Sequence, residues 1–151
     1  MEYQHLGNSG LQVSVVGLGC NNFGRRCDES QTAAVVHAAL DAGVTLFDTA
    51  DMYSRGVSEE YLGRALKGHR HEAVIASKFG MAMADDDIYM QGASRRYIME
   101  AVEASLRRLG TDHIDLYQVH HPNPATPLEE TLRALDDLVT SGKVRYLGNS
   151  N

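Results

Sequence analysis

Residues 114–148 read IDLYQVHHPNPATPLEETLRALDDLVTSGKVRYLG, and this stretch contains a complete strand–helix–strand unit. The continuous apolar run at 114–119 predicts a buried strand, and residues 144–148 predict the next strand along the chain. The segment between them has the length and the periodicity of a helix. Two strands joined in this way are parallel, because a parallel pair needs a crossover connection of this length.

The helix of this unit carries clear boundary signals. Thr126 and Glu129 have the spacing of a capping box, with Pro127 at the first helical position. Gly142 is expected to end the helix. The buried stripe is predicted to consist of Leu128, Leu132, Leu135 and Val139.

The same alternation runs through the preceding residues. The further predicted elements are strands at 13–18, 44–47 and 73–76 and helices before Gly43, at 58–66 and at 94–109. In the helix at 94–109, Ile98, Val102, Leu106 and Leu109 are expected to share one face, and Gly110 is expected to end it. Five strands alternating with four helices predict an α/β fold with a parallel sheet and right-handed crossovers. Residues 3–6 and 11–13 are expected to form a β-hairpin that caps the sheet. The unpatterned stretch 79–93 is expected to be a long functional or disordered loop.

The composition is that of an ordinary globular chain, and residues 1–151 are expected to form one domain. The chain has 43% hydrophobic and 23% charged residues and a formal net charge of −6. An acidic chain without a run of Lys or Arg lacks the positive surface that nucleic-acid binding requires. No apolar stretch is long enough to span a membrane, and no signal-peptide pattern is present. Cys20 and Cys27 form no disulfide framework, so we expect reduced thiols and a cytoplasmic protein.

Polar residues follow the predicted strands at the points where they end. The carboxyl ends of the strands form the working face of parallel α/β folds. Asp48, Lys78 and His120 end three of the strands, and Tyr53 lies a turn beyond Asp48. A phenol, with an ordinary pKa of about 10, donates a proton at neutral pH only when a neighbouring cation stabilises the phenolate. With Lys78 as that cation, Asp48 as its partner and His120 on a substrate oxygen, the set predicts reduction of a carbonyl group.

Four segments, in this order and spacing, resemble the signatures of the aldo-keto reductase family. They are residues 47–53 (FDTADMY), 77–78 (SK), 118–122 (QVHHP) and 148–151 (GNSN). The resemblance covers the whole chain and implies a (β/α)8 barrel of the TIM type. It also implies that NADPH, with NADH as an alternative, binds across the carboxyl-end face and that hydride passes to a small aldehyde or ketone without a metal ion.

The resemblance gives each motif residue a role. Tyr53 is implied to be the general acid, Lys78 and Asp48 the pair that tunes it, and His120 the residue that orients the carbonyl. The residues implied to contact the cofactor are Gly19, Cys20, Asn21, Asp48, Ser150 and Asn151. Cys20 and Asn21 stand where many members carry Thr-Trp, so the substrate wall at this edge is expected to differ.

Two other function classes remain open on the residues alone. Lys78 could be the amine of a Schiff-base lyase, which borohydride trapping of a substrate adduct would identify. The chain could instead be a non-catalytic nicotinamide-binding or regulatory protein, as the channel-associated members of the same family are. His69, His71 and the pair at 120–121 have no placed carboxylate or Cys partner, so no metal site is predicted.

Chain length sets a further expectation. Eight strand–helix units need about 250 residues, whereas five strands account for these 151 residues. We therefore expect the N-terminal part of a reductase, without its C-terminal strands and inactive alone.

Right-handed crossovers would place all four helices on one face of the sheet. The uncovered face and the open strand edges then favour self-association or a complementing C-terminal half.

Overall fold

The computed structural model describes residues 1–150, so Asn151, one of the predicted cofactor contacts, lies outside the described residues. A hairpin pairs β1 (Tyr3–His5) with β2 (Gln12–Ser14). The parallel sheet has the strand order β3 (Gly17–Gly19), β4 (Leu46–Asp48), β5 (Val74–Phe79), β6 (Ile114–Val119) and β7 (Val144–Asn149). The helices are α1 (Glu29–Asp41), α2 (Val57–Ala65), α3 (Arg95–Leu109) and α4 (Leu128–Thr140), with short 3₁₀ turns η1 (Tyr53–Gly56) and η2 (Arg70–Glu72).

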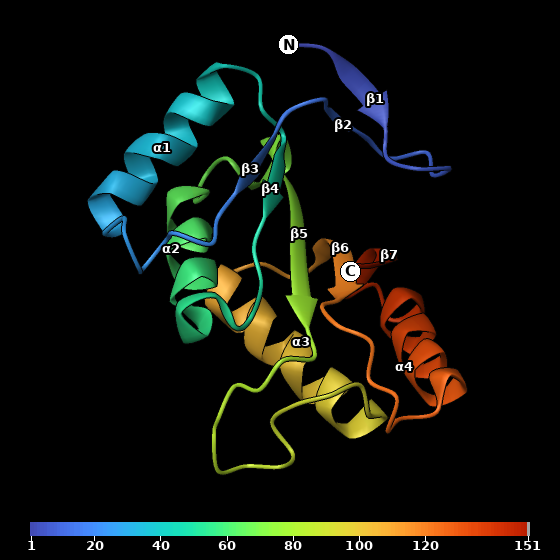
Figure 1. Cartoon of the computed structure of the whole chain (residues 1–151). Helices are drawn as coiled ribbons and strands as arrows, with labels where there is room; N and C mark the ends of the chain where they lie inside the picture. The colour runs from blue at the N-terminus through green and yellow to red at the C-terminus, as the bar shows by residue number, and fades with distance from the viewer. Residues whose placement is uncertain (151) are drawn as a thin grey trace.

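The helices cover one face of the sheet in the order of the chain. Contacts join α1 to α2, α2 to α3 and α3 to α4, so the four helices form an arc around the strands (Figure 1). The core lies between this arc and the sheet, and its largest buried side chains include Phe47, Phe79 and Tyr117. The predicted alternation of five strands and four helices is confirmed. The fold is a partial (β/α)8 barrel preceded by a hairpin.

The helix predicted from Ser94 is confirmed in its boundaries and in its buried face. The Ser94 hydroxyl accepts a hydrogen bond from the Tyr97 amide at the N-terminus, and Gly110 ends the helix with a φ of 63°. Ile98, Val102, Leu106 and Leu109 are all buried. This helix packs closely on α2, because a Cβ at Gly63 would lie 2.3 Å from the Leu109 carbonyl oxygen.

The prediction of one strand at 13–18 was wrong. Ser14 ends the hairpin strand, and the sheet strand begins only at Gly17. The Ser14 amide donates to Thr45 Oγ1 and the Thr45 amide donates to Ser14 Oγ, both over 2.9 Å. This exchange bends the chain, and Val15 and Val16 between the two strands are exposed. Val13, Val15 and Val16 are apolar on both sides of Ser14, so no local pattern signalled the bend.

The predicted N-terminus and buried stripe of α4 were also wrong. Pro127 is the N-cap residue and no side chain caps the helix, so Thr126 and Glu129 form no capping box. Only Leu135 of the predicted stripe is buried, whereas Leu128, Leu132 and Val139 are exposed. The buried face instead consists of Thr131, Ala134, Leu135 and Leu138. The Thr131 hydroxyl donates to the Ala93 carbonyl oxygen over 2.8 Å, which fixes the helix with this face inward.

Candidate active site

The four predicted catalytic residues meet at the carboxyl edge of the sheet. Asp48 ends β4, Lys78 lies near the end of β5, and His120 directly follows β6. Tyr53 begins η1, the short turn that follows β4. Three neighbouring strands therefore supply the four residues, and the fold places their side chains together because parallel strands end at the same edge.

Lys78 is the centre of this group. Its side chain is almost fully buried, and Nζ lies 2.7 Å from Asp48 Oδ1 and 2.8 Å from the Thr49 carbonyl oxygen. A third contact joins Nζ to the Tyr53 hydroxyl over 3.4 Å. The three N–H donors of an ammonium group account for this set. The Asp48 carboxylate and the Thr49 carbonyl oxygen occupy the amine, whereas a Schiff-base lyase needs a free neutral amine as its nucleophile.

Tyr53 and His120 face each other beside Lys78. Their ring centroids are 5.7 Å apart with an interplanar angle of 80°, and Lys78 Nζ lies 4.9 Å from the centre of the Tyr53 ring. Burial lowers the pKa of His120, and the nearby Lys78 ammonium lowers it further. His120 is therefore neutral at pH 7 and carries one N–H donor and one acceptor. Its Nδ1 is buried and has no hydrogen-bond partner among residues 1–150.

The turn that carries Tyr53 is conformationally strained. Ser54 and Arg55 both adopt left-handed backbone conformations, with φ values of 51° and 52°, and Gly56 follows with a φ of 95°. Such conformations cost about 1–3 kcal/mol for residues other than glycine and concentrate at functional sites. The Ser54 hydroxyl donates to the Phe23 carbonyl oxygen over 2.9 Å, which ties the turn to the loop after β3. Nothing in the sequence signalled this strain.

The residues predicted to contact the cofactor lie around the same edge, but they differ in how exposed they are. Gly19 is paired with Asp48 in the sheet, and a Cβ at Gly19 would meet no atom within 4 Å. Asn21 is exposed, and the Ser150 amide donates to the Val119 carbonyl oxygen over 2.9 Å. The Cys20 side chain is fully buried, and burial raises the pKa of its thiol. Only the backbone of Cys20 is thus available at this edge.

A buried polar cluster that we did not predict lies behind the four candidate catalytic residues. We call Asp51, Glu59, Ser77, Tyr97 and Arg108 the Glu59 cluster. Glu59 is fully buried, accepts a hydrogen bond from Ser77 Oγ over 2.5 Å and pairs with Arg108 Nε over 2.7 Å. The Tyr97 hydroxyl donates to Asp51 Oδ2 over 3.2 Å. These residues lie on helices or inside a motif. The prediction grouped only the polar residues that end strands, so it could not find them.

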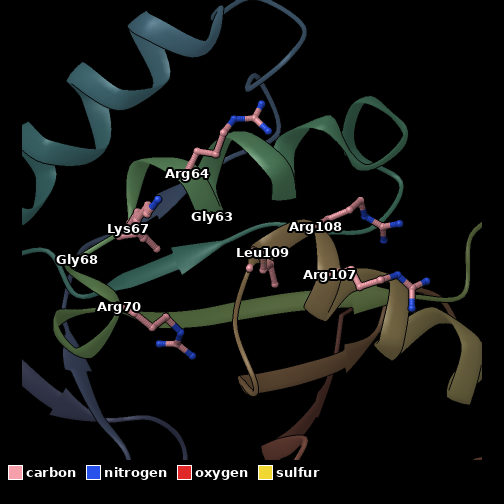
Figure 2. A pocket seen from close by; sticks show the side chains of 10 residues that line it. Gly63, Arg64, Lys67, Gly68, Arg70, Arg107, Arg108 and Leu109 are labelled. Atoms are coloured by element: carbon pink, nitrogen blue, oxygen red, sulfur yellow. The ribbon is translucent and has the colours of Figure 1, made fainter.

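The cavity in Figure 2 lies at the opposite end of the strands, where α2 and α3 end. It measures about 450 Å³ and is lined by the cationic residues Arg64, Lys67, Arg70, Arg107 and Arg108. Three of these are already paired with carboxylates: Arg64 with Glu29, Arg70 with Asp115 and Arg108 with Glu59. None of the four candidate catalytic residues lines this cavity, so it is not part of the candidate active site.

Within residues 1–150, no helix is long and apolar enough to cross a membrane. Within the same range, no group of three or more His, Cys, Asp or Glu side chains could hold a metal ion. His69 is hydrogen-bonded to Glu72, and the His120 ring stacks on the His121 ring.

Comparison with known proteins gives one family. The sequence profile of the Aldo/keto reductase family matches residues 15–151. Aldo-keto reductase YhdN of Bacillus subtilis is 41% identical over all of this chain and 47% of its own length. Versiconal hemiacetal acetate reductase of Aspergillus parasiticus is 42% identical over all of this chain and 51% of its own length.

A solved structure agrees with the sequence comparisons. Aldo-keto reductase AKR11C1 from Bacillus halodurans, in its holo form, superimposes with a TM-score of 0.91 at 40% identity, over 99% of this chain and 50% of that one. The chain spans about half the length of the relatives it matches. The profile match, the identity and the superposition together show that this chain belongs to the aldo/keto reductase family.

Proposed function

We propose that this chain carries the catalytic residues of an oxidoreductase that reduces a small aldehyde or ketone to an alcohol with NADPH. The observation that carries the proposal is the buried Lys78 ammonium, which contacts both Asp48 and the Tyr53 hydroxyl, with His120 facing Tyr53. Family membership supports carbonyl chemistry at this arrangement. The proposed location is the cytoplasm, in keeping with the two free cysteines.

Each residue has a distinct role in the proposed reaction. Tyr53 gives its hydroxyl proton to the carbonyl oxygen, while the carbonyl carbon accepts a hydride, so that an alcohol forms. Lys78 stabilises the phenolate that remains, and Asp48 holds Lys78 in place. Neutral His120 donates a hydrogen bond to the carbonyl oxygen, which fixes the orientation of the substrate.

The residues at this edge fit a nicotinamide group. Open space lies over Gly19, the Asp48 side chain is 40% exposed, and the buried Nδ1 of His120 lacks a partner. We propose that Gly19, Asn21, Asp48 and Ser150, together with Asn151, hold the cofactor, Cys20 contributing its backbone. A bound dihydronicotinamide supplies the hydride. Comparison of initial rates with NADPH and NADH decides between the two cofactors.

A chimera tests the proposal, because these 151 residues cover half of their relatives and we propose that they have little activity alone. Residues 1–151 are joined to the C-terminal half of aldo-keto reductase YhdN, and the product is called the chimera below. Cofactor-dependent reduction of a panel of aldehydes and ketones is then measured. Turnover supports the proposed function, and cofactor binding without turnover of any carbonyl would contradict it.

Replacement of Lys78 by Met in the chimera should lower kcat by about 10² or more, an effect in the range of general acid catalysis. The phenolate would lose its cation, and the Asp48 carboxylate would be left without its partner. The measurement is the pH dependence of kcat in both proteins. Lys67→Met removes an exposed lysine from the opposite end and should leave the profile unchanged. An unchanged profile in Lys78→Met would remove Lys78 from the proposed mechanism.

We also propose that the 151-residue chain associates with itself unless a complementing half covers it. Within residues 1–150, β3 and β7 each pair with one strand only, and Leu128 and Leu132 on α4 and Leu147 on β7 are exposed. Covering each such side chain stabilises by about 1.5–3 kcal/mol, and free edges pair readily with other strands.

Sedimentation equilibrium at micromolar concentration should therefore give a dimer or a larger species. Leu147→Lys places a charge on the β7 edge and should weaken the association. Val35→Lys, at an equally exposed position (both 40%) on α1, is the control and should not weaken it. A monomer with cooperative thermal unfolding would contradict this proposal.

A further inference from the structure

Asp51 connects the two segments that carry Tyr53 and Lys78. It lies two residues before Tyr53, and its backbone amide donates to the Lys78 carbonyl oxygen over 3.0 Å. The strained residues Ser54 and Arg55 come directly after Tyr53. Because a strained turn persists only when its surroundings hold it, the contacts of Asp51 bear on where the Tyr53 hydroxyl lies.

The Asp51 carboxyl group is buried with few hydrogen-bond donors. The residue is 1% exposed, Oδ2 accepts one hydrogen bond from the Tyr97 hydroxyl, and Oδ1 has no partner in the described part of the chain. It lines a cavity of about 170 Å³ under the loop at 80–94. The titratable or charged groups around it are Glu59 from α2, Tyr97, Glu100 and Arg108 from α3, Tyr117 from β6 and Asp87 from the loop.

The charges in this region favour a neutral Asp51. Arg108 already pairs with Glu59, and Glu59 also accepts from Ser77. An ionised Asp51 would be a second buried negative charge, with one hydroxyl donor and an unpartnered oxygen, which is costly in a protein interior. Burial and, after it, the Glu59 carboxylate raise the pKa of Asp51 to about 7.

We propose that Asp51 is a positioning residue for the Tyr53–Lys78 pair, that it holds the Tyr53 turn as a neutral carboxylic acid, and that it releases the turn when it ionises. The proposal rests on the proposed function for its significance, because it concerns the position of the proposed proton donor. It predicts an ordered turn below neutral pH and a displaced one above it.

The sign of the effect on stability follows from proton binding. Between the ordinary pKa of 3.8 and about 7, Asp51 is protonated in the fold and ionised in the unfolded chain. The free energy of unfolding should therefore decrease as the pH rises through this interval and level off above about 7. Asp51→Asn, which is neutral at every pH, should remove this decrease.

The test is an NMR titration of the chain labelled with ¹³C at tyrosine Cζ and aspartate Cγ. The Tyr53 signal is assigned by its loss in Tyr53→Phe. We expect it to shift with the same midpoint as the Asp51 carboxyl, about 7. The pKa of His120 is lowered from 6.5, so its own step falls at a lower pH. In Asp51→Asn the step near 7 should vanish and the Tyr53 signal should stay at its low-pH position.

Two further variants keep the proposal open to contradiction even if Asp51→Asn fails to fold. Tyr97→Phe removes the hydroxyl donor to Asp51 and should move the midpoint of the Tyr53 step to higher pH, because that hydrogen bond favours the ionised form. Glu100→Gln, on the same cavity but exposed, should leave the step in place.

A Tyr53 signal that does not follow the Asp51 titration, or a midpoint that Tyr97→Phe does not move, would overturn the proposal. The titration involves no turnover. An inactive chimera would therefore count against the proposed function alone, and an uncoupled Tyr53 signal in an active chimera would count against Asp51 alone.

Discussion

Replacement of Tyr53 by Phe in the chimera is expected to reduce kcat for carbonyl reduction by about 10²- to 10⁴-fold, the range of general acid catalysis. The phenyl ring keeps the shape of the side chain and its edge contact with His120. Only the hydroxyl group, and with it the contact to Lys78 Nζ, is lost. Cofactor affinity should therefore change little, which steady-state kinetics and a separate binding titration measure.

A matched variant separates this effect from general damage to the site. Tyr61→Phe removes the hydroxyl of a tyrosine on α2, away from the carboxyl edge, and should leave kcat unchanged. Turnover of Tyr53→Phe within a few-fold of the parent chimera would exclude Tyr53 as the proton donor.

Replacement of Arg108 by Met should lower the free energy of unfolding by about 3–5 kcal/mol, because it leaves the fully buried Glu59 carboxylate without its cation. This is a large share of the ~5–15 kcal/mol stability of a typical domain. The same change should loosen the Tyr53 turn, since Gly56 packs against the Arg108 side chain so closely that a Cβ there would lie 2.6 Å from Arg108 Cδ.

Arg64→Met is the control for this prediction. Its partner Glu29 is half exposed, and exposed ion pairs contribute about 0–1 kcal/mol. Urea denaturation of both variants at one protein concentration gives the comparison. Equal stabilities of Arg108→Met and Arg64→Met would show that the Glu59–Arg108 pair does not support the fold.

The architecture, and the meeting of the candidate catalytic residues at one edge, could be predicted because both follow from order along the chain. Apolar runs such as 114–119 and helix ends such as Ser94 and Gly110 are local signals, and the structure confirms them. Parallel strands end at one edge, so polar residues that end neighbouring strands become neighbours in space. Asp48, Lys78 and His120 could be grouped for this reason alone.

Other features depend on long-range contacts that no local pattern shows. The inward face of α4 is fixed by Thr131, whose hydroxyl donates a hydrogen bond to the carbonyl oxygen of Ala93. Ala93 lies in a loop that is distant along the chain. The bend after Ser14 depends on Thr45, which lies beyond the whole of α1. Glu59 has the sequence signature of a charged surface position on a helix, and only its contacts with Ser77 and Arg108 explain its burial.

The central claim, that Tyr53 and Lys78 serve carbonyl reduction, has one direct test. The chimera is incubated with an aldehyde and NADPH that carries deuterium at both positions of C4 of the nicotinamide, and the product is analysed by mass spectrometry. The account predicts an alcohol with one deuterium on the former carbonyl carbon, formed by the parent chimera and nearly absent with Tyr53→Phe. Cofactor binding without labelled alcohol, or equal labelling by Tyr53→Phe, would contradict it.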